Sequence, residues 1–534
     1  MRRYLAILGA VLLVATACTQ APTGTQATPA AATQAVAQPV RGGRIVEGSI
    51  SDIKTLQPVI ATDTASSAVW SKVYDSLLQN NPDTGDLAPN LAEKFDVSKD
   101  GKVVTYTLRA NLVWSDGTPF TGEDYKYTVE ATARSKKTVR KTQIQDILGF
   151  KDYESGKTDS MAGVVVKDGG KTIEVTLEKA QCVAARNLSG AGPGGILPKH
   201  AFVSGWNNKS TDTSKTIDDH PLNMKPPAAM GPFVFKEHLP GVQSTLVAND
   251  KYYGGRPNVD EWIIKVYADS VAIKAALLTG EVSFGSVQPA DIEEVQNAGR
   301  EILNMHRTKG VGNYTYIGWN QKAEKAPWLA SKQVRQALWY GLDVRTIIDK
   351  TVLGYGHTVY AHIPQASAFY EDPGFNKYPY DVSKAKQLLE AAGAKMGTDG
   401  IYRWTDGKPL QMRIETNQGN KVREQILEIA AEQYKKIGVK IDPLLESFPA
   451  LLDRTDCCKT DFDGFIIGWS LGVDPDSAMM GIWHSQNIKT NGFGNTQYNN
   501  PELDKLAEQG RFGPDCSTEA RKKAYSAAVK IATE

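Results

Sequence analysis

The sequence lacks long hydrophobic runs and lacks an excess of charge of either sign. After residue 18, nothing approaches the ~18 consecutive apolar residues that a membrane-spanning helix needs, so we expect no spanning segment in the body. The 61 basic residues nearly equal the 60 acidic ones, and no basic patch is visible. We therefore exclude nucleic acid and anionic lipid as partners.

Motifs for phosphate and cofactor chemistry are also missing. The chain has neither a G-x-x-x-x-G-K-[ST] loop nor a G-x-G-x-x-G unit between a strand and a helix. This excludes a transport ATPase or a dinucleotide enzyme as far as motifs can do so. We expect no cofactor and no metal site, and His357 and His362, five residues apart, leave metal capture only as a minor hypothesis.

Cysteines are few, and no two of them form C-x-x-C. An exported protein could pair Cys182, Cys457, Cys458 and Cys516, but their connectivity cannot be read from the sequence. The adjacent Cys457 and Cys458 predict a surface loop rather than a metal site.

The first 40 residues predict export and anchoring. A basic start, Met-Arg-Arg, precedes an apolar stretch to Ala17 that is too short to span a bilayer, so we expect residues 1–17 to be a signal peptide. Small residues before Cys18 resemble a bacterial lipobox, which implies a lipid on the Cys18 thiol. Residues 18–40 have no charge and no aromatic side chain, and therefore predict a flexible tether. The expected location is extracytoplasmic, at the membrane, in the periplasm or on the outer face of the cell membrane.

Two kinds of pattern follow along the body. Alternation of apolar and polar residues over 103–109 and 172–178, between Gly- and Pro-containing turns, predicts a mainly antiparallel sheet. From residue 330 onward the pattern becomes strand–helix–strand. Strands are predicted over 410–416, 439–445 and 462–469, and helices over 421–437 and 447–455.

This later run predicts a parallel sheet with right-handed crossovers. The carboxyl ends of its three strands then share one edge, where open α/β sheets bind their ligands. Three loops fall at that edge, at residues 417–420, 446–448 and 469–472.

The last of these loops carries a pentapeptide that fits a serine hydrolase. Residues 468–472 match G-x-S-x-G, with Ser470 in the place of a nucleophile. A nucleophile elbow needs a helix directly after the serine, whereas Pro475 would cost a helix there about 3 kcal/mol. His484 follows Ser470 by only 14 residues. We predict a ligand-contacting loop and no enzyme, and keep a lipid-anchored serine hydrolase as the disfavoured alternative.

Five stretches in order across the body resemble one family. They are residues 91–125 with the turn W-S-D-G-T-P, 231–284 with N-x-x-Y-x-G, YTYIGWN, VRQALWYGLDVRTIIDKTVLGYG and FDGFIIGWSLGVDPD. They resemble the extracytoplasmic solute-binding proteins of the peptide/nickel type, the oligopeptide- and dipeptide-binding proteins that serve ABC importers. The resemblance implies an α/β, two-lobed fold like that of periplasmic binding proteins, with mixed sheets, a hinge between the lobes and an extra third domain.

The resemblance also implies the domains. Domain I comprises residues 41–68 and 196–310, domain II residues 69–195, and domain III residues 311–534. The family normally returns from its last helix to domain I by an apolar strand, whereas this sequence stops at Glu534. We therefore expect either a fragment or a domain I without its last segment.

The resemblance implies which residues contact the solute: Trp469, Ser470, Gly472, Asp474, Phe448, Tyr316, Asn417, Asn420, Thr62, Asp63 and Thr64. In members that bind peptide amino termini, an aspartate pairs with the ammonium group at the position that is Gly472 here, and Asp474 is the nearest substitute. Gly318 likewise replaces a glutamate. The expected function is a monomeric binding protein that passes a solute to ABC permease subunits; the solute stays open between a peptide, an oligosaccharide and nickel.

Overall fold

The computed structural model describes residues 40–81, 86–190, 194–203, 212–299, 302–306, 313–360, 363, 367, 369, 374–472 and 474–534. The predicted signal peptide, Cys18 and the tether up to residue 39 lie outside the described residues, and so does His362. Residues 41–534 form one unit and are described by themselves. No helix in the described part of the chain combines the length and apolar character that crossing a membrane requires.

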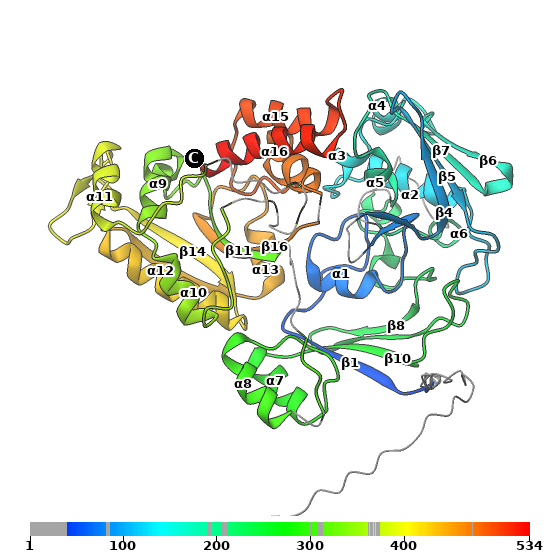
Figure 1. The fold of residues 1–534 in the computed structure, drawn as a ribbon, viewed down its shortest axis with the longest axis horizontal. Helices are drawn as coiled ribbons and strands as arrows, with labels where there is room; N and C mark the ends of the chain where they lie inside the picture. The colour runs from blue at the N-terminus through cyan, green and yellow to red at the C-terminus, as the bar shows by residue number, and fades with distance from the viewer. Residues whose placement is uncertain are drawn as a thin grey trace, which may run out of the picture. The chain divides into compact units, whose positions relative to one another are not determined.

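The first sheet combines segments that are far apart in the sequence. Its order is β1 (Arg44–Ser49), β10 (Glu261–Val266), β9 (Gln243–Ala248) and β8 (Phe233–Leu239). β1 is parallel to β10, and the other pairs are antiparallel. Figure 1 shows these four strands side by side, with α7 (Ser270–Leu278) and α8 (Ile292–Ala298) beyond the end of β1.

The second sheet confirms the antiparallel pattern predicted for residues 103–109 and 172–178. Its order is β4 (Ala92–Val97), β5 (Val103–Leu108), β7 (Thr172–Thr176) and β6 (Val164–Lys167), and every pair is antiparallel. Alternate side chains of β5 are buried, as the period of a half-buried strand requires. The helix α2 (Gly122–Arg134) begins with a capping box at Thr121 and packs against this sheet.

The third sheet confirms the predicted parallel run. Its order is β11 (Asn313–Trp319), β16 (Gly464–Ser470), β14 (Gln411–Asn417) and β15 (Lys440–Glu446). β14 is parallel to β15 and to β16, and β11 closes the edge antiparallel to β16. The predicted helices are α12 (Lys421–Lys436) and α13 (Phe448–Arg454), so the boundaries differ from the prediction by one or two residues.

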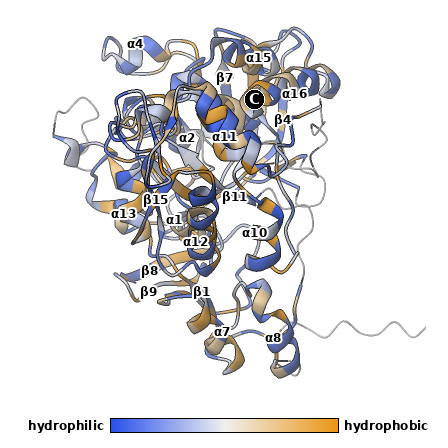
Figure 2. Cartoon of the chain, turned by 90° about the vertical axis from the view of Figure 1, so that its left-hand side faces the viewer, coloured by the Kyte–Doolittle hydropathy of each residue, from blue (hydrophilic) through white to orange (hydrophobic). Residues whose placement is uncertain are grey.

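The remaining helices and short strands cover these sheets or connect them. They are α1 (Thr64–Trp70), α3 (Lys141–Ile144), α4 (Phe150–Glu154), α5 (Ala184–Leu188), α6 (Lys199–Phe202), α9 (Lys332–Tyr340), α10 (Val344–Thr351), α11 (Val382–Ala391), α14 (Asp476–Ala478), α15 (Pro501–Phe512), α16 (Thr518–Thr533), β2 (Leu78–Asn80), β3 (Leu87–Pro89), β12 (Lys395–Met396) and β13 (Tyr402–Arg403). Figure 2 shows hydrophilic and hydrophobic residues interleaved along α10 and α11, as expected for helices with one face on a core.

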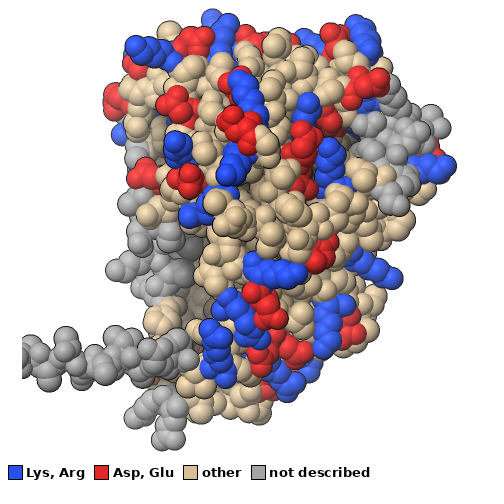
Figure 3. Space-filling model, turned by 90° about the vertical axis from the view of Figure 1, so that its right-hand side faces the viewer, with Lys and Arg blue, Asp and Glu red and all other residues tan. Residues whose placement is uncertain are grey.

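Buried apolar side chains fall into separate cores. The largest core, from Ile53 to Ile264, lies among the first two sheets. A second, from Ala323 to Ile466, lies on the third sheet, and a smaller one holds α15 and α16 together around Tyr525. The two largest cores mark two halves of the described residues, one with the first two sheets and the other with the third sheet. Figure 3 shows positive and negative side chains interspersed on the face it presents, in keeping with the balanced charge.

Candidate functional site

A cavity of about 2340 Å³ lies between the two halves. One wall is built from residues 54–67, 137–143 and 218–224. The facing wall comes from residues 313–360, 422–426 and 448–534, including the carboxyl end of β16. The edge of the parallel sheet, where the sequence predicts a ligand, is therefore part of the cavity surface.

The structure brings most of the predicted ligand residues to this cavity. Those that line it are Tyr316, Phe448, Trp469 and Ser470 on one wall and Thr62, Asp63 and Thr64 on the other. Gly472, Asp474, Asn417 and Asn420 are not among the lining residues.

An aromatic surface forms where β11 and β16 pair. Tyr314 and Tyr316 are two residues apart on β11 and so share a face of the sheet. The indole Nε1 of Trp469 donates a hydrogen bond of 3.1 Å to the Tyr316 hydroxyl. The Trp469 ring also meets Phe493 edge-on, with centroids 5.0 Å apart. These contacts hold Trp469 half-buried with part of its ring available to a ligand.

Arg423 is a cavity residue that the sequence reasoning missed. Its Nη1 donates to the Asn417 side-chain oxygen at 2.8 Å, and a Cβ atom on Gly468 would lie 3.0 Å from its Nη2. The guanidinium group therefore lies over β16, next to Trp469, and burial lowers its pKa. Its position in the sequence could have indicated a functional role, because a basic residue in the first turn of a helix is unfavourable next to the positive end of the helix dipole.

The two predicted amides, Asn417 and Asn420, both accept hydrogen bonds from Arg423. The side chain of Asn417, 1% exposed, accepts the Arg423 hydrogen bond and holds the guanidinium group in place. Asn420 is the N-cap of α12, where its side-chain oxygen accepts from the Arg423 backbone N–H at 3.1 Å. Both amides therefore position Arg423, and their contact with a solute stays a prediction.

On the opposite wall, Asp63 begins α1. Its Oδ1 accepts from the Ser66 backbone N–H at 2.7 Å, while its Oδ2 is buried and has no hydrogen-bond partner among the described groups. Burial raises the pKa of Asp63 above its ordinary value. Thr62 and Thr64 flank it on the cavity surface.

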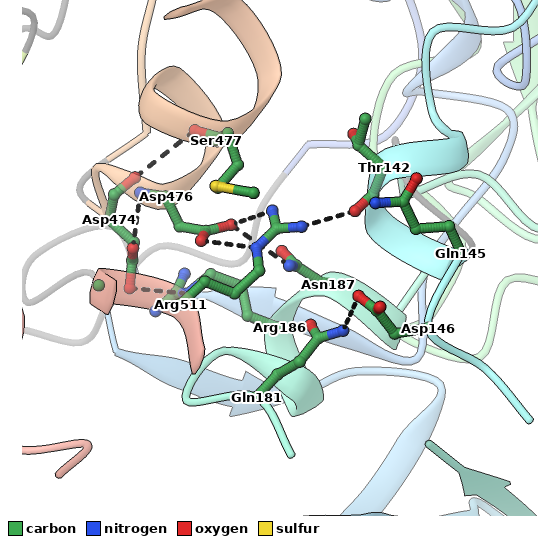
Figure 4. A network of polar contacts seen from close by, with 12 residues as sticks. Thr142, Gln145, Asp146, Gln181, Arg186, Asn187, Asp474, Asp476, Ser477 and Arg511 are labelled. Carbon is green, nitrogen blue, oxygen red and sulfur yellow. Dashed lines mark hydrogen bonds and ion pairs between the residues drawn. The ribbon is translucent and has the colours of Figure 1, made fainter. Parts of the chain in front are cut away.

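Asp474, contrary to the expectation from the sequence, is not available to a ligand. Arg521 binds both of its carboxylate oxygens, through Nη1 at 2.9 Å and Nη2 at 2.7 Å, and the pair is buried. Asp476 forms a second such pair with Arg511, which also donates to the carbonyl of Thr142 across the junction of the two halves (Figure 4). Both aspartates therefore hold the fold together.

The hydrolase alternative finds no support in this geometry. No hydrogen bond within the described residues joins Ser470 to His484, whose ring instead contacts Glu508 and accepts from the Gln486 backbone. No helix follows Ser470 directly, because α14 begins only at Asp476 with Pro475 as its N-cap. His357 lines the cavity, whereas its proposed partner lies outside the described residues.

The four cysteines among the described residues divide into a bonded pair and two free thiols. Cys182 and Cys516 form a disulfide, which the sequence could not assign. Cys457 and Cys458 are free, and Cys457 is 1% exposed, so the prediction of a surface loop for this pair is wrong at Cys457.

The two glycines at positions where the resemblance implies carboxylates, Gly318 and Gly472, differ in their surroundings. A Cβ atom at Gly318 would lie 2.5 Å from the Phe465 ring, so the ring occupies the space that a side chain would need. No heavy atom lies within 4 Å of a Cβ atom built on Gly472.

We expect this difference to show in two matched variants. Gly318→Ala should destabilise the protein by about 1–3 kcal/mol through overpacking, whereas Gly472→Asp should change the stability by no more than about 0.5 kcal/mol. Urea denaturation of the two variants beside the unaltered protein measures both effects. Equal losses of stability would contradict the distinction.

Comparisons with known proteins place these features in one family. The family model "Bacterial extracellular solute-binding proteins, family 5 Middle" matches residues 86–491. The oligopeptide-binding protein AppA of Bacillus subtilis is 30% identical over 515 residues, which cover 96% of this chain and 88% of AppA. The structure of AppA from Bacillus subtilis in complex with a nonapeptide is similar with a TM-score of 0.81 and 29% identity, covering 93% of this chain and 92% of that chain.

A further solved structure shares the fold. NikZ from Campylobacter jejuni, in complex with Ni(L-His), is similar with a TM-score of 0.75 and 24% identity, covering 91% of this chain and 90% of that chain. The two halves and the cavity between them agree with these matches. The chain belongs to the bacterial extracellular solute-binding proteins of family 5, and it is a binding protein of the ABC-importer type, not an enzyme.

Proposed function

We propose that this protein captures a peptide of several residues in the cavity and delivers it to the permease subunits of an ABC importer. The observation that carries the proposal is the cavity volume of about 2340 Å³. Drug-sized ligands fill pockets of about 300–1,000 Å³, so this cavity has room for a longer chain. The nonapeptide held by AppA, the relative described above, is a ligand of that size class.

The lining supports a peptide by its mixture of groups. Aromatic rings of Tyr316, Phe448 and Trp469 offer flat apolar surfaces, and Ser470, Thr62 and Thr64 offer hydroxyl groups. Such a surface binds chains of varied sequence, since few of its contacts depend on one particular side chain. The same rings suit an oligosaccharide, and His357 gives a nickel complex one ligand. The experiment below therefore also includes oligosaccharides and nickel.

We further infer the arrangement of the domains around the solute. Domain I, residues 41–68 and 196–310, and domain II, residues 69–195, form one wall, and domain III, residues 311–534, forms the other. The separate cores of the two halves support this division. Rotation of the halves about their connections would admit the solute and then enclose it. The protein acts as a monomer, tethered to the membrane by a lipid on Cys18.

A thermal-shift screen of the purified full-length protein tests the proposed function. Peptides of four to ten residues, oligosaccharides and nickel ions are added separately. A peptide at 100 times its Kd should stabilise the folded protein by about 2.7 kcal/mol, seen as a higher Tm. A shift with saccharides or nickel and none with any peptide would overturn the proposal.

Trp469→Ala provides the matching test of the site. Loss of the indole should weaken peptide binding about 10- to 100-fold, because half-buried aromatic side chains carry much of the binding energy of such sites. Trp404→Ala is the control, since Trp404 is also half-buried but packs on the domain III core, away from the cavity. Equal affinities of the two variants, measured by calorimetry, would show that Trp469 does not contact the peptide.

A further inference from the structure

Three arginine side chains line the cavity without a carboxylate partner among the described residues, and one of them, Arg335, donates through Nη1 to the backbone carbonyls of Leu329 and Ala330. The other two, Arg423 and Arg140, lie on opposite walls. On the α12 wall, Arg423 donates one hydrogen bond to Asn417, and its Nε and Nη2 donate to no described protein atom. On the opposite wall, the Nη2 of Arg140 donates to the Ala61 carbonyl at 2.5 Å, and its Nε is buried without a partner among the described groups. Neither guanidinium group forms an ion pair with any carboxylate in the described ranges.

Elsewhere the same chain supplies a carboxylate to its buried arginines. Arg511 and Arg521, 1% and 6% exposed, are bound by Asp476 and Asp474. This is the expected arrangement, because burying a guanidinium charge without a counter-charge is strongly unfavourable. Arg423 and Arg140 therefore lack the carboxylate partner that Arg511 and Arg521 have.

The acidic residues of the cavity do not compensate these charges. Three are already paired with lysines, in Lys54–Asp453, Lys137–Asp219 and Lys332–Glu534. Asp218 accepts hydrogen bonds from the Ser135 hydroxyl and from the backbone N–H groups of Lys136 and Lys137, and Glu502 is exposed. Asp63 and Asp456 form no ion pair with the described residues, and burial raises the pKa of both, which disfavours their negative form. A guanidinium group does not lose its charge on burial in the same way. Burial lowers the pKa of Arg140 only to about 10, so Arg140 stays positively charged at neutral pH.

Resting on the proposed function, we propose that the peptide is acidic and presents two anionic groups, one bound by Arg423 and the other by Arg140. A carboxylate can accept two parallel hydrogen bonds from a guanidinium group, so each arginine has the donors for one carboxylate. In a peptide these groups are the C-terminal carboxylate and the side chains of Asp or Glu. Because the two arginines lie on opposite walls, such a peptide links the two halves of the protein and favours their closure.

The surroundings of Arg423 suit this role. Gly468 leaves the space beside Nη2 that a Cβ atom would fill, and the buried Asn417 fixes Nη1. The guanidinium group is therefore oriented before the ligand arrives, and little side-chain freedom is lost on binding. The neighbouring Tyr316–Trp469 pair provides the apolar surface for the rest of the peptide.

Calorimetry with matched peptides tests this inference on the full-length protein. The probes are six-residue peptides with two glutamates and the same peptides with glutamine at both positions. The glutamate peptides should bind at least about tenfold more tightly. Arg423→Gln and Arg140→Gln should each remove most of this preference, while affinity for the glutamine peptides stays within about threefold.

Lys137→Gln is the control, because it removes a positive charge from the Arg140 wall that Asp219 already compensates. The control should keep the preference for glutamate, and circular dichroism checks that all variants are folded. Tight binding of both peptide sets with no preference would overturn this inference and leave the proposed function intact. Failure of every peptide to bind would instead contradict the proposed function itself.

Discussion

Asp476→Ala is expected to lower the free energy of unfolding by about 3–5 kcal/mol, among the largest effects of a single substitution in this chain. The variant leaves the Arg511 guanidinium group, 1% exposed, without its counter-charge. It also removes the acceptor of hydrogen bonds from Asn187 at 3.3 Å and from the Tyr525 hydroxyl at 3.2 Å. Asp476 thus binds side chains from both halves of the protein, as Figure 4 shows for Arg511 and Asn187.

The pH dependence of this contribution has a definite sign. Burial opposes ionisation of Asp476, but the charge and hydrogen bonds of Arg511 lower its pKa below the ordinary 3.8. A carboxylate with a lowered pKa in the folded state stabilises above its unfolded pKa and loses that contribution as the pH falls through its folded pKa. The difference in the free energy of unfolding between Asp476→Ala and the unaltered protein should therefore be largest at neutral pH and become smaller in acid.

Urea denaturation at pH 7 and in acid measures both effects. Asp399→Ala, which breaks the exposed i,i+4 pair with Arg403, is the control and should change stability little. Asp476→Leu combined with Arg511→Met should restore much of the stability, since it leaves no unpaired buried charge. A loss of stability no larger than that of the Asp399→Ala control would contradict the structural role assigned to Asp476.

The sequence was sufficient for features that depend on local pattern. The alternation over 103–109 and the strand–helix–strand run after residue 410 predicted two of the sheets, because side-chain periodicity reflects which face is buried. Gly438 directly follows the helix predicted over 421–437, and its φ of 76° is the left-handed conformation with which many helices end.

Features that depend on distant residues could not be predicted in this way. The partner of Asp474 is 47 residues further along the chain, and nothing near Asp474 identifies Arg521. The ring that fills the space at Gly318 belongs to Phe465, on the neighbouring strand of the third sheet. The resemblance implied carboxylates at both glycine positions, but only the structure shows that the space at Gly318 is filled and the space at Gly472 is open.

The final expectation concerns the disulfide between Cys182 and Cys516, which closes a sequence separation of 334 residues. Its surroundings also join the two halves: the Cys182 backbone N–H donates to the Arg511 carbonyl at 2.8 Å, and Gln145 donates to Gln486 at 3.1 Å. Replacing both cysteines with serine should destabilise the protein by about 2–5 kcal/mol. It should also speed peptide release, because the bond holds together the halves that must separate to open the cavity.

Chemical denaturation and stopped-flow peptide release, each with and without a thiol reductant, measure these effects. The unaltered protein should become less stable and release peptide faster when reduced, and the Cys182→Ser, Cys516→Ser variant should show both properties without reductant. Cys458→Ser, which removes a free thiol, is the control and should keep the response to reductant. Lower stability with an unchanged rate of peptide release would mean that the halves separate elsewhere and that the disulfide only restricts the conformations of the unfolded chain. If neither property changes, the disulfide does not hold the two halves together in solution.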